Sequence, residues 1–301
     1  MKKLLFIYNP GSGRGRISKN TEKIIGIFKE AGYDVTVRRT AAPLDCRDFI
    51  AEHAGEYSLT VAAGGDGTFH ELINGLERSG ADVPVGYIPS GTFNDLAASL
   101  GIPKDPVKAA RVAVSGSYMN IDSGSFNGSL FSYAAAFGLF TETGYETGET
   151  LKKALGHIAY YLKVASDMRP SKFEDCSHRI SIEADGDIYE GEFIYGLISS
   201  SLRVAGAVSV LPRDASMKDG LFDCLFIKTP RTQRDITRLR DSLISRRFDP
   251  EISVSLKARE LTLAFDRPAK WTLDGEYGGV TDHARLVCLP SSVRIAVPAK
   301  E

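Results

Sequence analysis

A glycine-rich segment in the first half of the chain carries the residue types of a phosphate-binding loop. The segment 64–68, Gly-Gly-Asp-Gly-Thr, follows an apolar run that ends at Ala63 and precedes an amphipathic run from Phe69 to Leu76. A strand, a glycine turn and a helix start in this order direct main-chain N–H groups to a point where an anion can bind closely. Thr68 is expected to cap the helix or to donate its hydroxyl to a phosphate oxygen. Asp66 would repel a phosphate on its own, so we expect it to meet a metal ion or to orient a neighbour. A nucleotide with Mg²⁺ would satisfy these residues together.

Two further loops follow apolar runs and precede helical patterns. Asn9–Gly15 has neither the Lys-Ser/Thr pair of a P-loop nor Gly-x-Gly-x-x-Gly spacing, and alone it indicates only a tight strand–helix connection. Pro89–Asp95 is explained, when taken alone, by helix capping from Thr92 or Asn94. Three such loops after three strands favour a ligand site, because parallel sheets bind ligands at the carboxyl ends of their strands.

Acidic residues of the second half fall in two short glycine-containing segments. Residues 273–276, Leu-Asp-Gly-Glu, place two carboxylates two positions apart. Phosphoryl transfer to an alcohol needs a base that accepts the hydroxyl proton, together with a metal that balances the phosphate charge. Without other motifs this segment would be an exposed turn, and Lys-Asp-Gly at 218–220 would be a hairpin turn.

The elements expected to position these groups differ between the two halves of the chain. Before about residue 120, strand runs alternate with helical patterns; the runs are 4–8, 33–39, 59–63 and 83–88. Such alternation implies a parallel sheet covered on both faces. Later strand runs have few helices among them, at Leu151–Met168 and Thr232–Ser245; the runs are 179–184, 191–199, 221–228, 252–256, 260–265 and 284–289.

We therefore predict an α/β protein with two domains. Residues 1–122 would form an α/β nucleotide-binding domain on a parallel sheet, and residues 123–290 an antiparallel β-sandwich domain. Residues 291–301 would be a tail that could return to the first domain.

Composition excludes several other classes of protein. The 301 residues are 43% hydrophobic and 25% charged, with a formal net charge of −1, so nothing points to nucleic acid as a partner. The four cysteines are far apart and indicate neither a zinc site nor disulfides. No apolar stretch is long enough to span a bilayer. We expect a reduced, cytoplasmic protein.

Several motifs, taken in order, resemble those of the diacylglycerol-kinase catalytic family, and more narrowly its soluble bacterial lipid kinases. These motifs are Asn9-Pro10-x-Ser12-Gly13, Gly64–Thr68, Ser90-Gly91-Thr92-x-Asn94-Asp95, Met217–Asp223 and Leu273–Glu276. The resemblance covers nearly the whole chain. It implies the NAD-kinase/diacylglycerol-kinase-like fold, with an ATP site between the α/β domain and a β-sandwich domain that takes the lipid substrate.

The resemblance also implies roles for individual residues. Those assigned to the nucleotide are Asn9, Ser12, Gly13, Thr40, Gly64, Gly65, Asp66, Gly67, Thr68, Thr92, Asn94 and Asp95. A structural Mg²⁺ would take the Asp219 carboxylate and the main-chain carbonyls of Ser216 and Leu221, since oxygen donors suit a hard cation. Glu276 would be the base and Asp274 would orient metal or substrate, although the two roles could be exchanged.

The function implied is an ATP- and Mg²⁺-dependent lipid kinase, with diacylglycerol as the acceptor and phosphatidic acid as the product. One alternative is an NAD kinase, whose family shares the Gly-Gly-Asp-Gly-Thr loop. Another is a lipid-binding regulator that has the fold without turnover.

A lipid kinase of this kind would contact the inner membrane surface transiently. One candidate is the helical pattern that places Arg231, Arg234 and Arg238 on one face and apolar residues on another. The alternative is a core-packed helix with a solvated basic face. The oligomeric state stays open, with a homodimer as a candidate.

Overall fold

The computed structural model describes residues 2–139, 173–174, 176–201, 203–204, 207–208, 216–245 and 247–299. The helix predicted at Leu151–Met168 lies outside these residues. The chain divides into two compact units, which are described separately. Unit 1 consists of Met1–Ser123, Ser129–Ser132 and Pro290–Glu301, and unit 2 of Gly124–Gly128 and Tyr133–Leu289.

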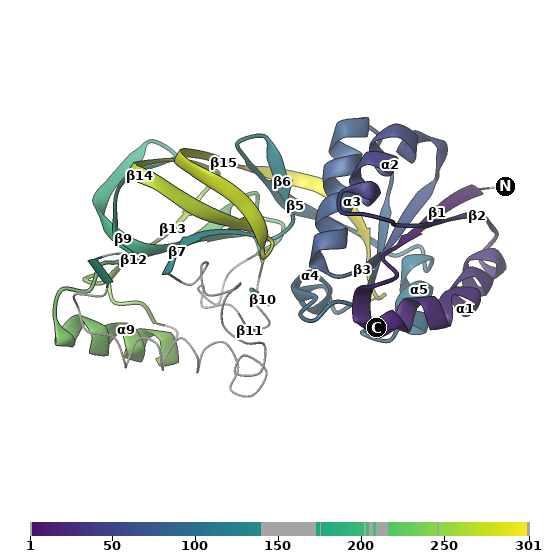
Figure 1. Ribbon diagram of the computed structural model, residues 1–301, viewed down its shortest axis with the longest axis horizontal. Helices are drawn as coiled ribbons and strands as arrows, with labels where there is room; N and C mark the ends of the chain where they lie inside the picture. The colour runs from purple at the N-terminus through teal and green to yellow at the C-terminus, as the bar shows by residue number, and fades with distance from the viewer. Residues whose placement is uncertain are drawn as a thin grey trace. The chain divides into compact units, whose positions relative to one another are not determined.

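Unit 1 is built on a parallel sheet. Its first strands are β1 (Lys2–Tyr8), β2 (Tyr33–Arg39), β3 (Leu59–Gly64) and β4 (Val85–Pro89). Its α-helices are α1 (Arg16–Glu30), α2 (Asp45–His53), α3 (Asp66–Ser79), α4 (Asp95–Ser99) and α5 (Pro106–Ala113). The strands pair in parallel in the order β4-β3-β1-β2. Figure 1 shows α2 and α3 on one face of the sheet and α1 and α5 on the other. The predicted α/β arrangement is confirmed.

The residue pattern of the central strands explains this sheet. Leu4–Ile7 of β1 are fully buried and every residue of β3 is buried, as expected for strands covered on both faces. α3 has the complementary helical pattern, with Phe69, Leu72 and Ile73 in the core. It ends at Ser79 and is followed by Gly80, whose φ of 64° a glycine adopts without a steric penalty.

The end of the chain belongs to the same sheet. β15 (Glu276–Ala296) is a long strand, and near its end Ile295 pairs in parallel with Val85 of β4. Asp122 accepts a hydrogen bond from the N–H of Ser291 at 2.8 Å. The C-terminal residues therefore extend the sheet of unit 1 beyond β4. The strands β5 (Tyr118–Phe126) and β6 (Ser129–Phe131) pair with each other.

Unit 2 is antiparallel. Its other strands are β7 (Ala134–Gly138), β8 (His178–Ala184), β9 (Asp187–Ser199), β12 (Phe222–Lys228), β13 (Ser253–Ala258) and β14 (Glu260–Leu273), with the short pair β10 (Arg203–Val204) and β11 (Ala207–Val208). The hydrogen-bonded order is β13-β12-β9-β7-β14-β15. β8 also pairs with both β9 and β14, in line with β7. β7 and β8 therefore occupy successive stretches of the same position between β9 and β14.

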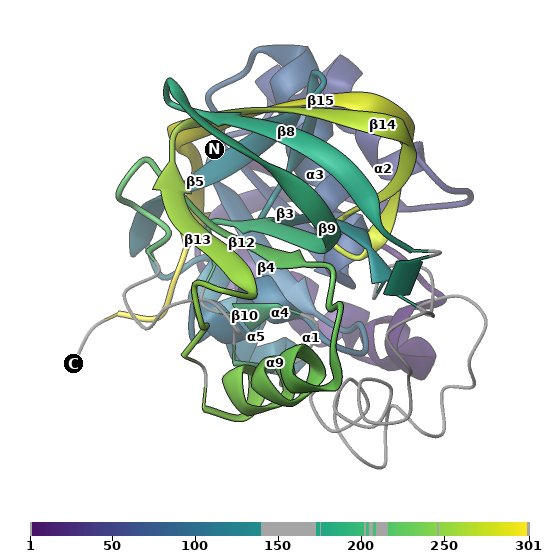
Figure 2. The same cartoon turned by 90° about the vertical axis from the view of Figure 1, so that its left-hand side faces the viewer.

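Aromatic rings fill the core of unit 2. Trp271 is fully buried, and its ring centroid lies 4.8 Å from that of Phe126, 5.0 Å from that of Phe137 and 6.0 Å from that of Phe265. Phe226 of β12 lies 6.4 Å from Phe137. Figure 2 shows β8, β14 and β15 in one layer and β9, β12 and β13 in a second. The predicted antiparallel sandwich is confirmed.

The predicted basic helix is α9 (Gln233–Ser245), and its apolar face is packed. Ile236, Leu239 and Leu243 are buried. Arg231 forms an ion pair with Glu192, and Arg238 forms one with Glu251. These contacts correspond to a core-packed helix with a solvated basic face. Of the helices that the described ranges contain, none is both long and apolar enough to cross a membrane.

Trp271→Ala should lower the free energy of unfolding by about 3–5 kcal/mol, because it opens a cavity among the aromatic rings. Urea unfolding would be followed by circular dichroism, since Trp271 is the single tryptophan of the chain. Trp271→Phe is the matched control. It keeps an aromatic ring and removes an indole N–H that has no hydrogen-bond partner among the described residues, so its effect should be smaller. Equal losses would contradict the packing role.

Candidate functional site

Three loops follow the carboxyl ends of parallel strands in unit 1. We name them loop 1 (Asn9–Gly15), loop 2 (Gly64–Thr68) and loop 3 (Ser90–Asp95). Loop 1 contains the 3-10 helix η1 (Ser12–Gly15). Main-chain hydrogen bonds join the three: Asn9 N–H donates to the carbonyl of Ala63 at 3.0 Å, and Ser90 N–H donates to that of Gly64 at 2.7 Å. The structure thus brings the three glycine-rich segments together at one edge of the sheet.

Glycine permits the close contact between these loops. Gly13 has a φ of 60°, and a Cβ there would lie 2.5 Å from the carbonyl oxygen of Ser90. A Cβ on Gly91 would lie 2.6 Å from the Cα of Gly65. A side chain at either position would therefore push the loops apart. The hydroxyl of Ser90 also donates to that of Ser12 at 2.8 Å, which links loops 1 and 3 directly.

Asn94 organises loop 3. Its φ of 55° is left-handed, a conformation that asparagine adopts more readily than most residues. Its Oδ1 accepts the N–H of Gly91 and its Nδ2 donates to the Gly91 carbonyl, both at 2.8 Å. Asp66 of loop 2 accepts the N–H of Asn94 at 2.8 Å. Of the two roles expected for Asp66, orienting a neighbour is therefore observed. Asn94 precedes α4, but its side chain bonds within loop 3 and does not cap that helix.

Thr68 does not cap α3. The residue before the helix is Gly65, and Asp66 is already the first helical residue. A carboxylate is favoured at that end of a helix, so the helix begins before the threonine. The N–H of Thr68 donates to the Gly65 carbonyl at 3.0 Å. Gly64 is needed beside it, because a Cβ at that position would overlap the Thr68 hydroxyl.

The remaining predicted nucleotide residues also belong to unit 1. Thr40 follows β2, and its N–H and hydroxyl both donate to the carbonyl of Tyr8, at 3.0 and 3.4 Å, beside the start of loop 1. Gly67 lies in the first turn of α3, and Thr92 is exposed within loop 3. Asp95 is buried as the first residue of α4.

Tyr87 is a member of this site that sequence analysis missed. Its single O–H lies within hydrogen-bond distance of two acceptors, the Gly64 carbonyl and Asn94 Oδ1, each at 3.4 Å. Burial raises the pKa of Tyr87 well above its usual value, and the carboxylates of Asp66 and Asp95 act in the same direction. The phenol therefore stays a protonated donor at neutral pH. In the sequence Tyr87 is only one more residue of an apolar strand run.

Asp274 and Glu276 lie at the turn between β14 and β15 in unit 2. Asp274 and Gly275 form a two-residue turn with φ values of 53° and 85°, the conformation that favours an Asp-Gly pair. Asp274 is only 3% exposed, and its Oδ1 accepts the N–H groups of Tyr133 at 2.9 Å and Ala134 at 3.2 Å. Glu276 is exposed. The segment is therefore more than an exposed turn, because the main chain before β7 encloses one of its two carboxylates.

Asp219 lies in a bend before β12, in the segment predicted to bind a metal with Ser216 and Leu221. Its Oδ1 accepts the N–H of Leu221 at 3.3 Å, and its Oδ2 lies 3.1 Å from Nζ of Lys257. The same ammonium lies 3.4 Å from the buried Asp223. One carboxylate and main-chain carbonyls are donors of the type that Mg²⁺ takes. The donor types fit, but Lys257 already supplies a cationic partner that a metal ion would have to displace.

This fold and this site define a phosphotransferase class: an α/β unit with glycine loops in close contact, joined to an antiparallel β unit whose β14–β15 turn carries one buried and one exposed carboxylate. The family model of the diacylglycerol kinase catalytic domain matches residues 3–126. The diacylglycerol kinase of Bacillus subtilis (strain 168) is 33% identical over 306 residues, which cover 100% of this chain and 98% of that protein. That of Staphylococcus epidermidis (strain ATCC 12228 / FDA PCI 1200) is 32% identical, over 99% of this chain and 92% of the relative.

Solved structures agree with this match. One from Bacillus anthracis (strain Sterne) is 25% identical, with a TM-score of 0.84 over 99% of this chain and 95% of that chain. A diacylglycerol kinase structure from the same organism, 22% identical, has the same fold, with a TM-score of 0.77 over 99% of this chain and 97% of that chain. The chain belongs to the diacylglycerol kinase family and is a kinase, as the motifs predicted.

Gly91→Ala should lower phosphoryl-transfer activity by at least about 100-fold, because small displacements of groups that position a substrate have effects of this size. The added Cβ would separate loops 2 and 3. Activity would be measured in the assay described below. Gly26→Ala in α1 is the control, since a Cβ there meets no atom within 4 Å. Full activity in Gly91→Ala would show that this contact is not needed.

Proposed function

We propose that this chain is a lipid kinase that transfers the γ-phosphoryl group of ATP to a lipid hydroxyl with Mg²⁺ present, and that diacylglycerol is the acceptor. The observation that carries the proposal is the contact among loops 1, 2 and 3, where Gly13, Gly65 and Gly91 allow the main chain to converge. Such a surface lets phosphate groups approach the backbone closely. The names of the Bacillus subtilis and Staphylococcus epidermidis relatives support diacylglycerol as the acceptor.

The nucleotide phosphates would be held by loops 1–3 together with Thr40. Asn94 and Asp66 would act by keeping loop 3 in place, in accord with the hydrogen bond between them. Tyr87 would stabilise the contact between loops 2 and 3 through its hydrogen bond to the carbonyl of Gly64. These groups are joined to one another by hydrogen bonds, so little reorganisation would be needed when the nucleotide binds.

Glu276 is the proposed base, and Asp274 the proposed orienting group. The lipid hydroxyl oxygen would attack the γ-phosphorus, its proton would pass to Glu276, and ADP would leave. Glu276 is exposed and so accessible to an acceptor. The Asp274 carboxylate is held by the N–H groups of Tyr133 and Ala134, which suits a group that must stay in one position.

Apolar side chains beside Glu276 support a lipid acceptor. Tyr277 is 59% exposed and Val280 is 56% exposed, both at the start of β15. Exposed apolar groups of this size next to a proposed base suit a substrate whose hydroxyl adjoins acyl chains. We propose that this hairpin contacts the acceptor at the inner membrane surface, where the protein would bind transiently.

Two other functions make different predictions. An NAD kinase would also use a Gly-Gly-Asp-Gly-Thr loop, but its acceptor has no acyl chain that could contact the exposed side chain of Val280. A lipid-binding regulator without turnover would not depend on the Glu276 carboxylate. The lipid kinase gives a role both to this exposed carboxylate and to the exposed side chains of Tyr277 and Val280.

Glu276→Gln should lower kcat by about 10²–10⁴-fold, the usual contribution of a general base. The purified chain would be incubated with labelled ATP, Mg²⁺ and mixed micelles that contain diacylglycerol, a sphingoid base or a polyprenol, with NAD in a parallel reaction. We expect labelled phosphatidic acid from the unaltered chain and KM values for Glu276→Gln within about threefold of normal.

Asp274→Asn and Glu190→Gln are the companion variants. Asp274→Asn should also lower kcat, whereas Glu190→Gln, on β9, should leave it unchanged. Labelled NADP in the absence of lipid would establish the NAD kinase. Lipid binding without consumption of ATP would establish the regulator. Full activity in Glu276→Gln would reject Glu276 as the base.

Mg²⁺ binding is proposed at Asp219, with the carbonyls of Ser216 and Leu221 as further ligands. The ion would neutralise the Asp219 carboxylate and would stabilise the bend before β12 by binding residues on both sides of it. Lys257 would compete with it, because its ammonium lies 3.1 Å from Oδ2 of Asp219.

Lys257→Met should therefore tighten Mg²⁺ binding by about fivefold, the equivalent of one half-exposed ion pair. Asp219→Asn should abolish binding at this site. Both would be measured by calorimetric titration of nucleotide-free protein with MgCl₂. Lys23→Met, which removes an exposed positive charge from α1, is the control. Weaker binding in Lys257→Met would show that this lysine supports the ion.

A further inference from the structure

The residue that precedes α2 has a backbone conformation that its own packing does not explain. Leu44 has a φ of 68°, in the left-handed region that a leucine rarely adopts. Its side chain is 45% exposed, so burial does not compensate for the strain. A residue keeps such a conformation only where surrounding contacts impose it, and such residues concentrate at functional sites.

A carboxylate from α3 bonds to the main chain of this residue. Oε1 of Glu71 accepts the main-chain N–H of Leu44 at 3.0 Å. Glu71 lies in the second turn of α3, the helix that begins with Asp66 of loop 2. A hydrogen bond to an ionised acceptor is stronger than one between neutral groups. The strained residue is therefore attached to the helix that carries the proposed phosphate loop.

The same face of α3 holds α2 itself. Gly75 is four residues after Glu71 and so lies on the same side of the helix. A Cβ on Gly75 would lie 2.6 Å from the carbonyl oxygen of Arg47, which shows how closely α2 approaches. Sγ of Cys46 lies 3.9 Å from the carbonyl oxygen of Thr68, to which it donates. Three successive turns of α3 therefore fix α2 and the segment before it.

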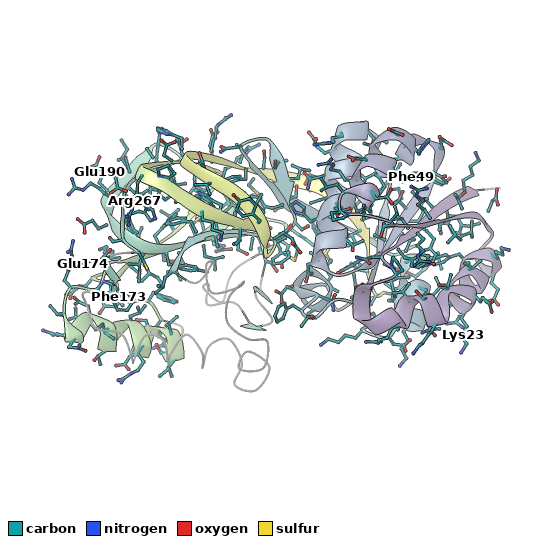
Figure 3. The ribbon with its side chains drawn as sticks, in the orientation of Figure 1. Lys23, Phe49, Phe173, Glu174, Glu190 and Arg267 are labelled. Carbon is teal, nitrogen blue, oxygen red and sulfur yellow. The ribbon has the colours of Figure 1, made fainter. Side chains whose placement is uncertain are left out.

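The start of the segment that precedes α2 is also held by hydrogen bonds. Oδ2 of Asp45 accepts the N–H of Ala41 at 2.7 Å, and its Oδ1 accepts a hydrogen bond from Arg38 at 3.0 Å. The Ala41 hydrogen bond, and then that of Arg38, keep the pKa of Asp45 below its usual value, so it stays ionised. The Arg38 guanidinium lies 4.9 Å from the ring centroid of Phe49, a residue of α2 labelled in Figure 3. Segment 40–44 is thus held at Ala41 by Asp45, and Glu71 joins the main chain of its last residue, Leu44, to α3.

We propose that Glu71 is a positioning residue for the nucleotide: through Leu44 it sets segment 40–44 so that Thr40 meets the nucleotide held by loops 1–3. The inference rests on the proposed function, because it needs a nucleotide at these loops. Glu71 acts through the main chain of Leu44 and does not touch the substrate. No motif in the sequence assigns it such a role.

Glu71→Ala should raise the dissociation constant for ATP and the KM for ATP by about tenfold, the loss expected for one hydrogen bond to a charged acceptor. Its kcat at saturating ATP should change by less than about twofold. Binding would be measured with a fluorescent ATP analogue on the full chain, and turnover with diacylglycerol micelles. Glu71→Gln should bind ATP nearly normally, because its amide oxygen can still accept the Leu44 N–H.

Two further variants separate positioning from general stability. Glu77→Ala removes an exposed glutamate from the same helix and should have no effect. Leu44→Asn in the Glu71→Ala background should recover most of the affinity, because asparagine adopts the left-handed conformation without support from Glu71. A rescue of this kind is not expected if Glu71 only stabilises α3.

The outcomes are distinguishable. If the unaltered chain binds no ATP, the proposed function fails and this inference fails with it. If the unaltered chain binds ATP and Glu71→Ala binds it equally well, the inference alone is overturned. A lower kcat at normal affinity in Glu71→Ala, or no rescue by Leu44→Asn, would also overturn it.

Discussion

Loops 2 and 3 approach each other so closely at Gly65 and Gly91 that no side chain could lie between them. This contact is available because β3 and β4 are adjacent parallel strands whose carboxyl ends share one edge of the sheet. Loop 1 then contacts loop 3 at Ser90, again across a glycine. The constraint is steric, and it makes the loops into one surface in which the position of each depends on the other two.

Carboxylates hold loop 3 and the segment before α2 by accepting hydrogen bonds from the main chain of distant residues. Asp66 accepts the N–H of Asn94, and Glu71 accepts that of Leu44. The same arrangement occurs in unit 2, where Asp274 accepts the N–H of Tyr133. A main-chain N–H bound by a charged acceptor fixes the backbone itself, which matters most in loops, where no sheet or helix supplies a partner. Asp66, Glu71 and Asp274 therefore each have a structural role, in addition to any role in chemistry.

The long hairpin of unit 2 shows where sequence patterns stop being informative. The runs 260–265 and 284–289 predicted two short strands, but β14 and β15 continue well beyond them. Residues 266–268 include a proline and are exposed, and the register of the pairing shifts there. A proline cannot donate to the ladder, so the local pattern ends although the strand resumes at Ala269. The second half of β14 is recognisable as a strand only from its pairing with β15 and β7 and from the burial of Trp271.

The sequence by itself determined the alternation of elements in the first half, the antiparallel second half, the three glycine loops and the family to which the chain belongs. These depend on local properties: apolar periodicity, and the few residue types that permit tight turns near an anion. The tertiary structure decided which acidic residues are buried ties and which are exposed. It also decided that Thr68 lies inside α3, that Tyr87 contacts loops 2 and 3, and that Glu71 bonds to the main chain of Leu44. The position of Thr68 depends on the residue at which α3 starts. The other features depend on hydrogen-bond partners that are distant in the sequence, from 7 residues for Tyr87 and Asn94 to 141 residues for Tyr133 and Asp274. Such partners are chosen by chain folding, so no local pattern could contain them.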